Sequence, residues 1–86
     1  MPGADLRALV EYLVRGLVDD PGAVGVRATE RDRLVIIEIR VAEEDLGKVI
    51  GRRGRIVGAI RTLARAAALP DGRRVMVEIV QKSSLG

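Results

Sequence analysis

The stretch Gly47-Lys48-Val49-Ile50-Gly51-Arg52-Arg53-Gly54-Arg55 decides the fold of this chain. Residues 43–50, which lead into it, predict a short helix with Leu46, Val49 and Ile50 turned inward. Residues 55–69, which follow, predict a longer helix that stops at the turn signal Pro70-Asp71-Gly72. The four residues Gly51–Gly54 are therefore expected to form a tight basic loop between two helices.

Apolar periodicity on either side of this stretch predicts the remaining elements. Residues 6–18 carry apolar side chains at the spacing of one helix face, with Asp5 as a helix cap. Residues 24–29, 34–41 and 74–80 alternate as half-buried strands do. The predicted order is α-β-β-α-α-β in a single α+β domain over residues 1–80, followed by a flexible tail at 81–86.

The composition argues against an enzyme. The 86 residues include no cysteine and no histidine, so thiolate nucleophiles, the commonest general base and the commonest metal ligand are all missing. The acidic trio Glu43-Glu44-Asp45 is expected to complement the dipole at a helix start. We therefore expect no catalytic residues, no metal site and no cofactor.

The charges are unevenly distributed along the chain, although the net charge is only +3. Residues 1–45 have a net charge of −4, whereas residues 46–74 hold eight cations against Asp71 alone. The basic half is centred on the glycine-bracketed loop, which is typical of a site for a polyanion. Arg52 and Arg53 stand at the start of a helix, where cations are unfavourable unless an anion is bound and where free N–H groups bind phosphate.

Neither end of the chain nor its interior indicates a membrane protein. The N-terminus lacks the charged leader and apolar core of a signal peptide. The longest apolar runs are about four or five residues, against the roughly 20 that a membrane span needs. We expect a cytoplasmic location.

The run from Gly47 to Arg55 and the order of elements together resemble a KH domain of the prokaryotic (type II) topology. The resemblance covers residues 6–80, and at this length the chain is similar to the small stand-alone bacterial KH proteins of the KhpA family. It implies a three-stranded mixed sheet with three helices packed on one face. It also implies that the loop clamps the backbone of single-stranded RNA while bases enter a groove between the two helices and the 34–41 strand.

The residues expected at the RNA site combine close approach, charge and apolar walls. The two glycines of the loop let the RNA backbone approach without a Cβ in the way, and the arginines hydrogen-bond phosphate oxygens. The expected RNA-binding residues are Gly51, Arg52, Arg53, Gly54, Lys48, Arg55, Arg61, Arg65, Val49 and Ile50. Further groove-wall candidates are Ile56 and Val57 on the helix side, and Ile36 with Glu38 or Arg40 on the strand side.

At about 100° per residue, the helix over residues 55–69 has a broad apolar arc. The residues expected to face the core are Ile56, Ala59, Ile60, Leu63, Ala66 and Ala67. Arg61 and Arg65 fall on the opposite side, together with Gly54 and Gly58. Val57, Ala64 and Ala68 widen the arc beyond the core, which leaves open either extra packing against the first helix or a self-association surface.

Tyr12 is the only aromatic residue, which argues against RNA-binding folds that stack bases on several aromatic side chains. We expect an RNA chaperone or post-transcriptional regulator whose partner is single-stranded RNA. The resemblance implies, in addition, a homodimer or a heterodimer with a second KH protein. The alternatives are a protein-interaction or assembly module and a ribosome-biogenesis factor, in both of which RNA binding is secondary.

Overall fold

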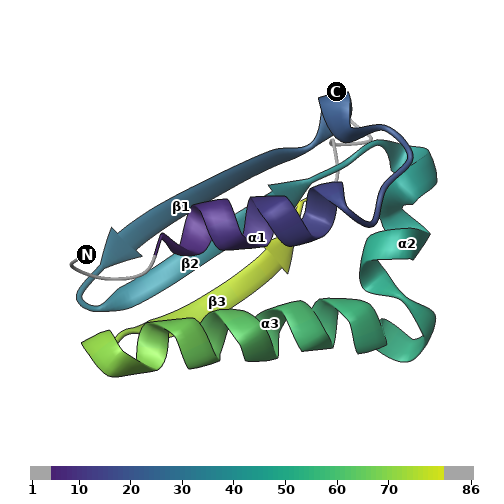
Figure 1. Ribbon diagram of the computed structural model, residues 1–86. Coiled ribbons are helices and arrows are strands. Elements are labelled where there is room, and N and C mark those ends of the chain that lie inside the picture. Colours follow the sequence, from purple (N-terminus) through teal and green to yellow (C-terminus); the bar gives the residue numbers. More distant parts are fainter. Residues whose placement is uncertain (1–4, 81–86) are drawn as a thin grey trace.

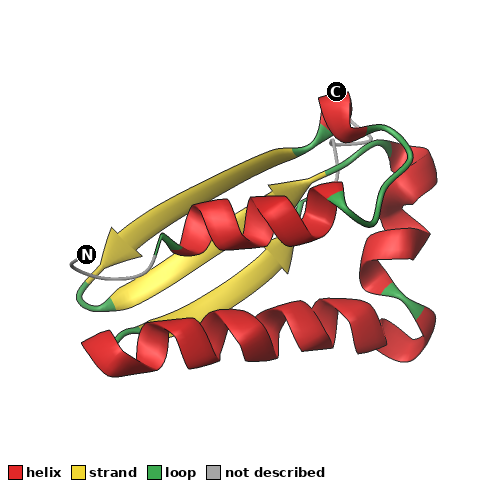
Figure 2. Cartoon of the chain, in the orientation of Figure 1, coloured by secondary structure: helices red, strands yellow, loops and turns green. Residues whose placement is uncertain are grey.

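Residues 5–80 are described by the computed structural model, in which three helices cover one face of a three-stranded sheet (Figure 1, Figure 2). The helices are α1 (Leu6–Arg15), α2 (Leu46–Ile50) and α3 (Arg55–Ala68), and the strands are β1 (Gly25–Arg31), β2 (Leu34–Arg40) and β3 (Arg74–Ile79). The predicted order of elements and the α+β class are confirmed. The predicted tail at 81–86 lies outside the described residues.

Helix α1 begins where the sequence predicts and ends earlier. The Asp5 carboxylate accepts a hydrogen bond from the N–H of Ala8 at 3.0 Å and so caps the first turn. Three apolar side chains at helical spacing, those of Leu6, Val10 and Val14, are buried. The helix stops at Arg15 instead of residue 18, and Leu17 and Val18 pack against the core as part of the following connection.

The sheet has the order β1-β2-β3, so β2 lies in the middle and β3 at one edge. β1 pairs with β2 antiparallel through the two-residue turn Asp32-Arg33, and β2 pairs with β3 in parallel. The parallel pair requires a crossover, and the connection through α2 and α3 supplies it (Figure 1). The mixed three-stranded sheet that the resemblance implies is thereby confirmed.

The two faces of the sheet differ because side chains alternate along each strand. Val35, Ile37 and Ile39 of β2 are buried beneath the helices, together with Val75 and Val77 of β3. The other face of the sheet carries no helix in the described part of the chain (Figure 2). The packing of all three helices on one face is thus also confirmed.

The segment before α2 is a short 3-10 turn over Glu43–Asp45 that leads into α2. Asp45 does more than complement a helix dipole, because only 2% of it is exposed and its carboxylate accepts a hydrogen bond from the N–H of Asp20 at 3.1 Å. Val49 is buried as expected, whereas Ile50 was wrongly predicted to point inward and is 37% exposed. Ile50 is the last residue of α2, so it reaches the surface where the chain turns into the loop.

The buried face of helix α3 is rotated from the predicted one, although Ile60, Ile56 and Ala67 lie in or beside the core as predicted. Ile60, Ala64 and Ala68 are the buried residues, with Ile56, Val57 and Ala67 packed beside them. Ala59, Leu63 and Ala66, which were predicted to face the core, are exposed. The prediction centred the apolar face of the helix on Ile56, but α3 packs against both α1 and β3. Its buried face is therefore rotated towards the small alanines, which permit a close approach of the helix to its neighbours.

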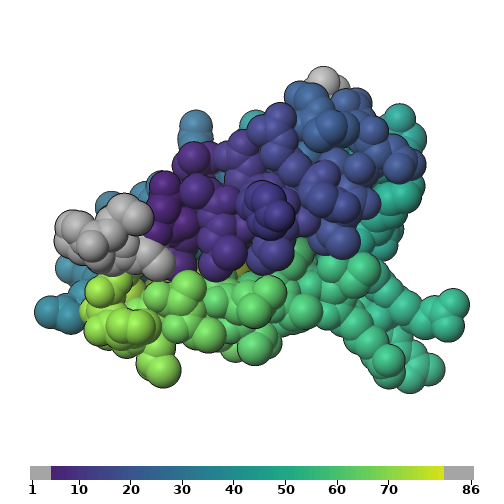
Figure 3. Space-filling model, viewed as in Figure 1, coloured from purple at the N-terminus to yellow at the C-terminus, as the bar shows by residue number. Residues whose placement is uncertain are grey.

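Helices α1 and α3 lie side by side on the helical face, where their surfaces form a continuous layer (Figure 3). Within residues 5–80, none of the helices is long and apolar enough to cross a membrane.

Candidate nucleic-acid interface

The loop Gly51–Gly54 joins α2 to α3 as one tight 3-10 turn, and the Gly54 N–H donates to the Gly51 carbonyl oxygen at 3.1 Å. Three of its residues have positive φ: 76° at Gly51, 58° at Arg53 and 73° at Gly54. This region costs about 1–2 kcal/mol for a residue with a Cβ and little for glycine. The turn therefore depends on its two glycines and holds Arg53 in a strained conformation.

Gly51 is required for a second reason, which is space. A Cβ at this position would lie 2.6 Å from Cγ1 and 2.9 Å from the backbone N of Ile56. A Cβ on Gly54 would meet only Cγ1 of Val57 at 3.9 Å, an ordinary contact. The start of α3 thus packs directly against the backbone of Gly51, and this contact fixes the loop relative to the helix.

Arg52 and Arg53 extend from this turn into solvent. Figure 3 shows the teal-green segment around residues 50–55 projecting from the body of the molecule. Neither guanidinium forms an ion pair with any residue of the described chain. They stand at the N-terminus of the 14-residue helix α3, which has no side-chain cap at Gly54. Uncapped N–H groups, a positive helix end and two unpaired guanidiniums together form an anion-binding arrangement.

A cavity of about 520 Å³ lies between α3 and the edge strand β3. Its walls combine apolar and basic side chains: Leu34, Leu69, Val75, Met76, Val77, Arg61, Arg65, Arg73 and Arg74. Arg61 spans the cavity wall, because its Nη2 donates to the carbonyl oxygen of Val77 at 3.4 Å. An apolar floor with a guanidinium rim is suited to a ligand that has flat apolar groups on an anionic chain.

The strand side of the groove was predicted incorrectly. The sequence argument placed Ile36 and either Glu38 or Arg40 there, on the assumption that β2 borders the helices' groove. β2 is instead the central strand, and these three side chains alternate with the buried Val35, Ile37 and Ile39. They therefore lie on the opposite face of the sheet, and β3 is the strand that borders the cavity.

The other predicted site residues divide into three groups. Arg55 is exposed at the start of α3, and Ile50 is exposed at the end of α2, so both flank the loop. Arg61 and Arg65 line the cavity on the β3 side of α3. Val49 is wholly buried in the core, so it supports the loop from beneath and cannot line a groove.

Lys48 is already paired within the protein. Its Nζ lies 2.9 Å from a carboxylate oxygen of Asp19 and 3.5 Å from one of Asp45. The hydrogen bond from Lys48 to Asp19 accompanies a raised pKa of the Lys48 ammonium. These contacts tie the connection after α1 to the start of α2, and two carboxylates already balance the lysine charge.

Leu69, Met76 and Arg74 are wall residues of the cavity that the sequence analysis missed. Met76 is 46% exposed and Leu69 is 75% exposed, so both present apolar surface at the cavity. The alternation of β3 could have indicated Met76, because Val75 and Val77 occupy its buried face. Which strand borders α3, however, depends on the sheet order.

The sequence of the chain matches the family model described as "KhpA/KhpB, KH domain" over residues 7–79. This chain belongs to the KhpA/KhpB KH-domain family. Among curated relatives, "RNA-binding protein KhpA" of Caldanaerobacter subterraneus is 53% identical over 72 residues, which cover 84% of this chain and 96% of the relative. The KhpA proteins of Leifsonia xyli and Borreliella burgdorferi are 48% and 47% identical, over 87% and 84% of this chain and 96% and 88% of their own lengths.

Two solved structures of the protein Era resemble the KhpA/KhpB-family fold seen here. One is Aquifex aeolicus Era bound to GDP and aluminium fluoride, and the other is Era with MgGDPNP and nucleotides 1506–1542 of 16S ribosomal RNA. Each matches with a TM-score of 0.54 at 29% identity, over 92% of this chain and 32% of the Era chain. The chain therefore spans about a third of the length of Era, and the likeness concerns one part of that protein.

Proposed function

We propose that this protein binds single-stranded RNA without catalysing a reaction, and that it acts as an RNA chaperone or post-transcriptional regulator in the cytoplasm. The exposed, unpaired Arg52–Arg53 pair on the glycine-bracketed loop carries the proposal, since its charges lack a partner at an uncapped helix N-terminus. The relatives named "RNA-binding protein KhpA", which this chain matches over nearly their whole length, support it. Phosphates bind at the loop, and bases further along the strand enter the cavity between α3 and β3, whose nearest α3 wall residue, Arg61, lies about 10 Å along the helix axis from the loop.

Two features of this chain support a binding module in preference to an enzyme. It has no histidine or cysteine. Within residues 5–80, no group of three or more acidic side chains is placed to hold a metal ion. The ribosome-biogenesis alternative is not favoured, because the chain is similar to the KhpA proteins over most of their length and to only 32% of Era.

The deciding experiment removes the two loop charges. In Arg52→Gln/Arg53→Gln, each lost charge-assisted hydrogen bond is worth about 1.5 kcal/mol or more, so the affinity for a labelled single-stranded RNA should fall at least tenfold. For the wild type, with about three phosphates neutralised, the slope of log affinity against log salt should be near −2, and the variant should lose about 1.4 of it. Fluorescence anisotropy at several salt concentrations measures both quantities.

Arg7→Gln/Arg15→Gln is the matched control, because it changes the net charge equally on the exposed surface of α1. This control should keep the wild-type affinity and slope. Equal losses in both double variants would mean that net charge alone attracts the RNA, and the loop assignment would then be wrong.

We also infer that the chain pairs with a second KH chain. The predicted surface at Ala64 and Ala68 is unavailable because both residues are buried. Leu63 on α3 is 50% exposed and Tyr12 on the neighbouring α1 is 78% exposed, so these side chains are better candidates for the contact. Analytical ultracentrifugation should show a dimer that Leu63→Asp dissociates. A dimer that persists in Leu63→Asp would exclude this surface.

A further inference from the structure

The sheet face opposite the helices carries a pattern of charges that the loop and its cavity do not use. Three rows of residues cross the strands on this face: Arg27-Glu38-Glu78, Thr29-Ile36-Met76 and Arg31-Leu34-Arg74. Arg40, opposite Gly25, lies beyond the first row. The rows and Arg40 together give an apolar centre with four arginines around it and two glutamates on one side.

We infer that this open face is a second contact surface for the same RNA strand, which continues from the α3–β3 cavity around the edge of β3 and onto the sheet. The inference rests on the proposed function. It adds a site that the loop does not provide: Ile36 and Met76 contact bases, and Arg27 and Arg40 hold phosphates.

The cavity itself reaches this face. Val75 and Val77 line it from the helix side of β3, whereas Arg74 and Met76 of the same strand line it from the open side. Leu34 of β2, another wall residue, also points to the open side, because it alternates with the buried Val35. The cavity therefore wraps around the edge of β3, and a chain seated in it has a continuous apolar path to Ile36.

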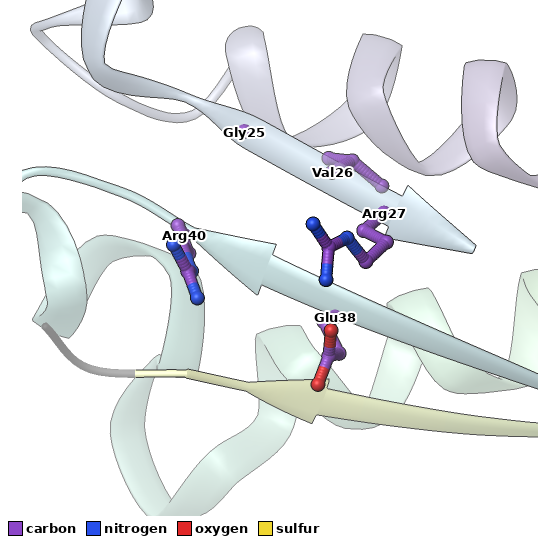
Figure 4. A pocket seen from close by; sticks show the side chains of 5 residues that line it. All are labelled: Gly25, Val26, Arg27, Glu38 and Arg40. Carbon is purple, nitrogen blue, oxygen red and sulfur yellow. The ribbon is translucent and has the colours of Figure 1, made fainter. Parts of the chain in front are cut away.

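The arginines at the far end of this path are available for a ligand. A hollow of about 200 Å³ is lined by Gly25, Val26, Arg27, Glu38 and Arg40 (Figure 4). Figure 4 shows the side chains of Arg27, Glu38 and Arg40 together on two neighbouring strands. Within residues 5–80, neither Arg27 nor Arg40 forms an ion pair with a carboxylate, although Glu38 is the direct cross-strand neighbour of Arg27. Unpaired guanidiniums in a hollow are complementary to phosphate.

The two glutamates favour a nucleotide chain over a bare polyanion. Glu38 and Glu78 are direct neighbours in the parallel pair of strands, where like charges oppose each other. Carboxylates accept hydrogen bonds from the amino groups of bases, as they do from cytosine. Four arginines against two glutamates leave the face with a net positive charge. The spacing is also suitable, because Arg27 on β1 lies two strand spacings, about 10 Å, from the edge strand.

Salt dependence on RNAs of two lengths tests this surface. One oligocytidine has about 6 nucleotides, slightly more than the four that a KH loop clamps, and the other is twice as long. For the wild type, the slope of log affinity against log salt should be steeper on the longer RNA by about 1.4, the contribution of two further phosphates. Arg27→Gln/Arg40→Gln should show the shorter RNA's slope on both lengths and wild-type affinity for the shorter one.

The controls separate this surface from the loop and from dimerisation. Arg7→Gln/Arg15→Gln, which carries the same change in charge, should keep the extra slope on the longer RNA. Equal slopes for the two lengths in the wild type would overturn the inference while leaving the loop site intact. An extra slope that survives in Arg27→Gln/Arg40→Gln would also overturn it, because a second protomer would then be holding the longer RNA. A change in oligomeric state in this variant would assign the face to a protein partner instead.

Discussion

Gly51 and Gly54 bracket the same loop but are glycines for different reasons. Both have positive φ, so both avoid the cost of a side chain in the left-handed region. Only Gly51 also faces the backbone and side chain of Ile56 at distances that no Cβ can occupy. The sequence predicted a pair of equivalent glycines that make room for RNA, whereas the structure makes one of them a packing contact within the protein.

Alanine substitutions should therefore have unequal effects. Gly54→Ala should lower the free energy of unfolding by about 1 kcal/mol, the cost of backbone strain alone. Gly51→Ala should cost about 2–4 kcal/mol, because strain and overpacking add. Urea denaturation followed by circular dichroism measures both values. Equal costs would show that α3 can move away from Gly51.

Asp45 shows what residue patterns cannot reveal. It was predicted as one of three equivalent acids at a helix start, yet it is buried and bonded to backbone groups distant in sequence. Burial raises the pKa of its carboxyl, but hydrogen bonds from the backbone of Asp19 and Asp20 and from Lys48 outweigh it, so the net pKa is lowered. No local pattern encodes a partner 25 positions away.

The lowered pKa gives Asp45 a defined effect on stability. A carboxyl whose folded pKa lies below its unfolded value, about 3.9, stabilises the protein above that value and loses this effect as the pH falls through the folded pKa. Asp45→Asn should therefore be less stable than the wild type at pH 7, with a difference that shrinks below about pH 4. Urea titrations across this range measure it. The same measurement on Glu11→Gln compares Asp45 with a carboxyl on an exposed helix surface, where hydrogen bonding to Arg7 lowers the pKa of Glu11. A difference for Asp45→Asn that does not change with pH would contradict the role given to this carboxylate.

At the scale of elements, the β1–β2 hairpin is closed by an unusual pair of residues. Asp32 and Arg33 both have positive φ, at 51° and 65°, the pattern of the two-residue turn that favours Asn-Gly. Asp32→Asn/Arg33→Gly should raise the free energy of unfolding by about 1 kcal/mol, because it removes this strain. Thermal unfolding measures the gain. Arg31→Gly, in the extended strand beside it, is the control and should destabilise by about 0.5–1 kcal/mol.

Helix α3 is the element whose existence was predicted correctly and whose orientation was not. Its ends were placed within one residue, because glycine and proline mark them. Its buried face depends on α1 and β3, which pack against it from two directions, and helical periodicity alone does not give their positions. The predicted self-association residues Ala64 and Ala68 consequently proved to be core residues.

A pair of alanine variants tests this orientation. Ile60 is 3% exposed, so Ile60→Ala should cost about 2–4 kcal/mol of stability through the cavity that it leaves. Leu63 is half exposed, so Leu63→Ala should cost under about 1 kcal/mol. Chemical denaturation at a protein concentration that keeps the chain monomeric separates the two effects. A larger cost for Leu63→Ala would restore the orientation predicted from the sequence.

For the whole molecule, the sequence predicted the order of elements and the loop, because both depend on local signals such as alternation and glycine placement. The groove was predicted less well. Which strand borders the cavity depends on the order of strands in the sheet. Because β2 was taken as that strand, Ile36, Glu38 and Arg40 were predicted on the helix side, whereas they lie on the opposite face of the sheet. Which of the basic residues bind RNA stays a prediction.

The core of the molecule also extends across the whole described chain. Helix α1 supplies Leu6, Val10 and Val14, each at most 3% exposed, to the layer between helices and sheet. A domain of this size has a small free energy of unfolding. A chain that begins at Val24 lacks α1 and should therefore lose cooperative unfolding. Urea titration followed by circular dichroism tests this, and a sharp transition in the shortened chain would show that α1 is dispensable.

The edge of β3 has a consequence for the behaviour of the protein at high concentration. The N–H groups of Arg74 and Val80 donate to the carbonyl oxygens of Arg33 and Ile39, towards β2, so the backbone groups of the alternate residues Val75 and Val77 point outward. An unprotected edge of this kind recruits further strands and leads to fibrils. The Arg61 guanidinium bonds the Val77 carbonyl oxygen, and the charge of Arg74 stands at the start of the strand. The arginines that border the cavity thus hinder the pairing of a further strand, such as one from a second copy of the protein, with β3.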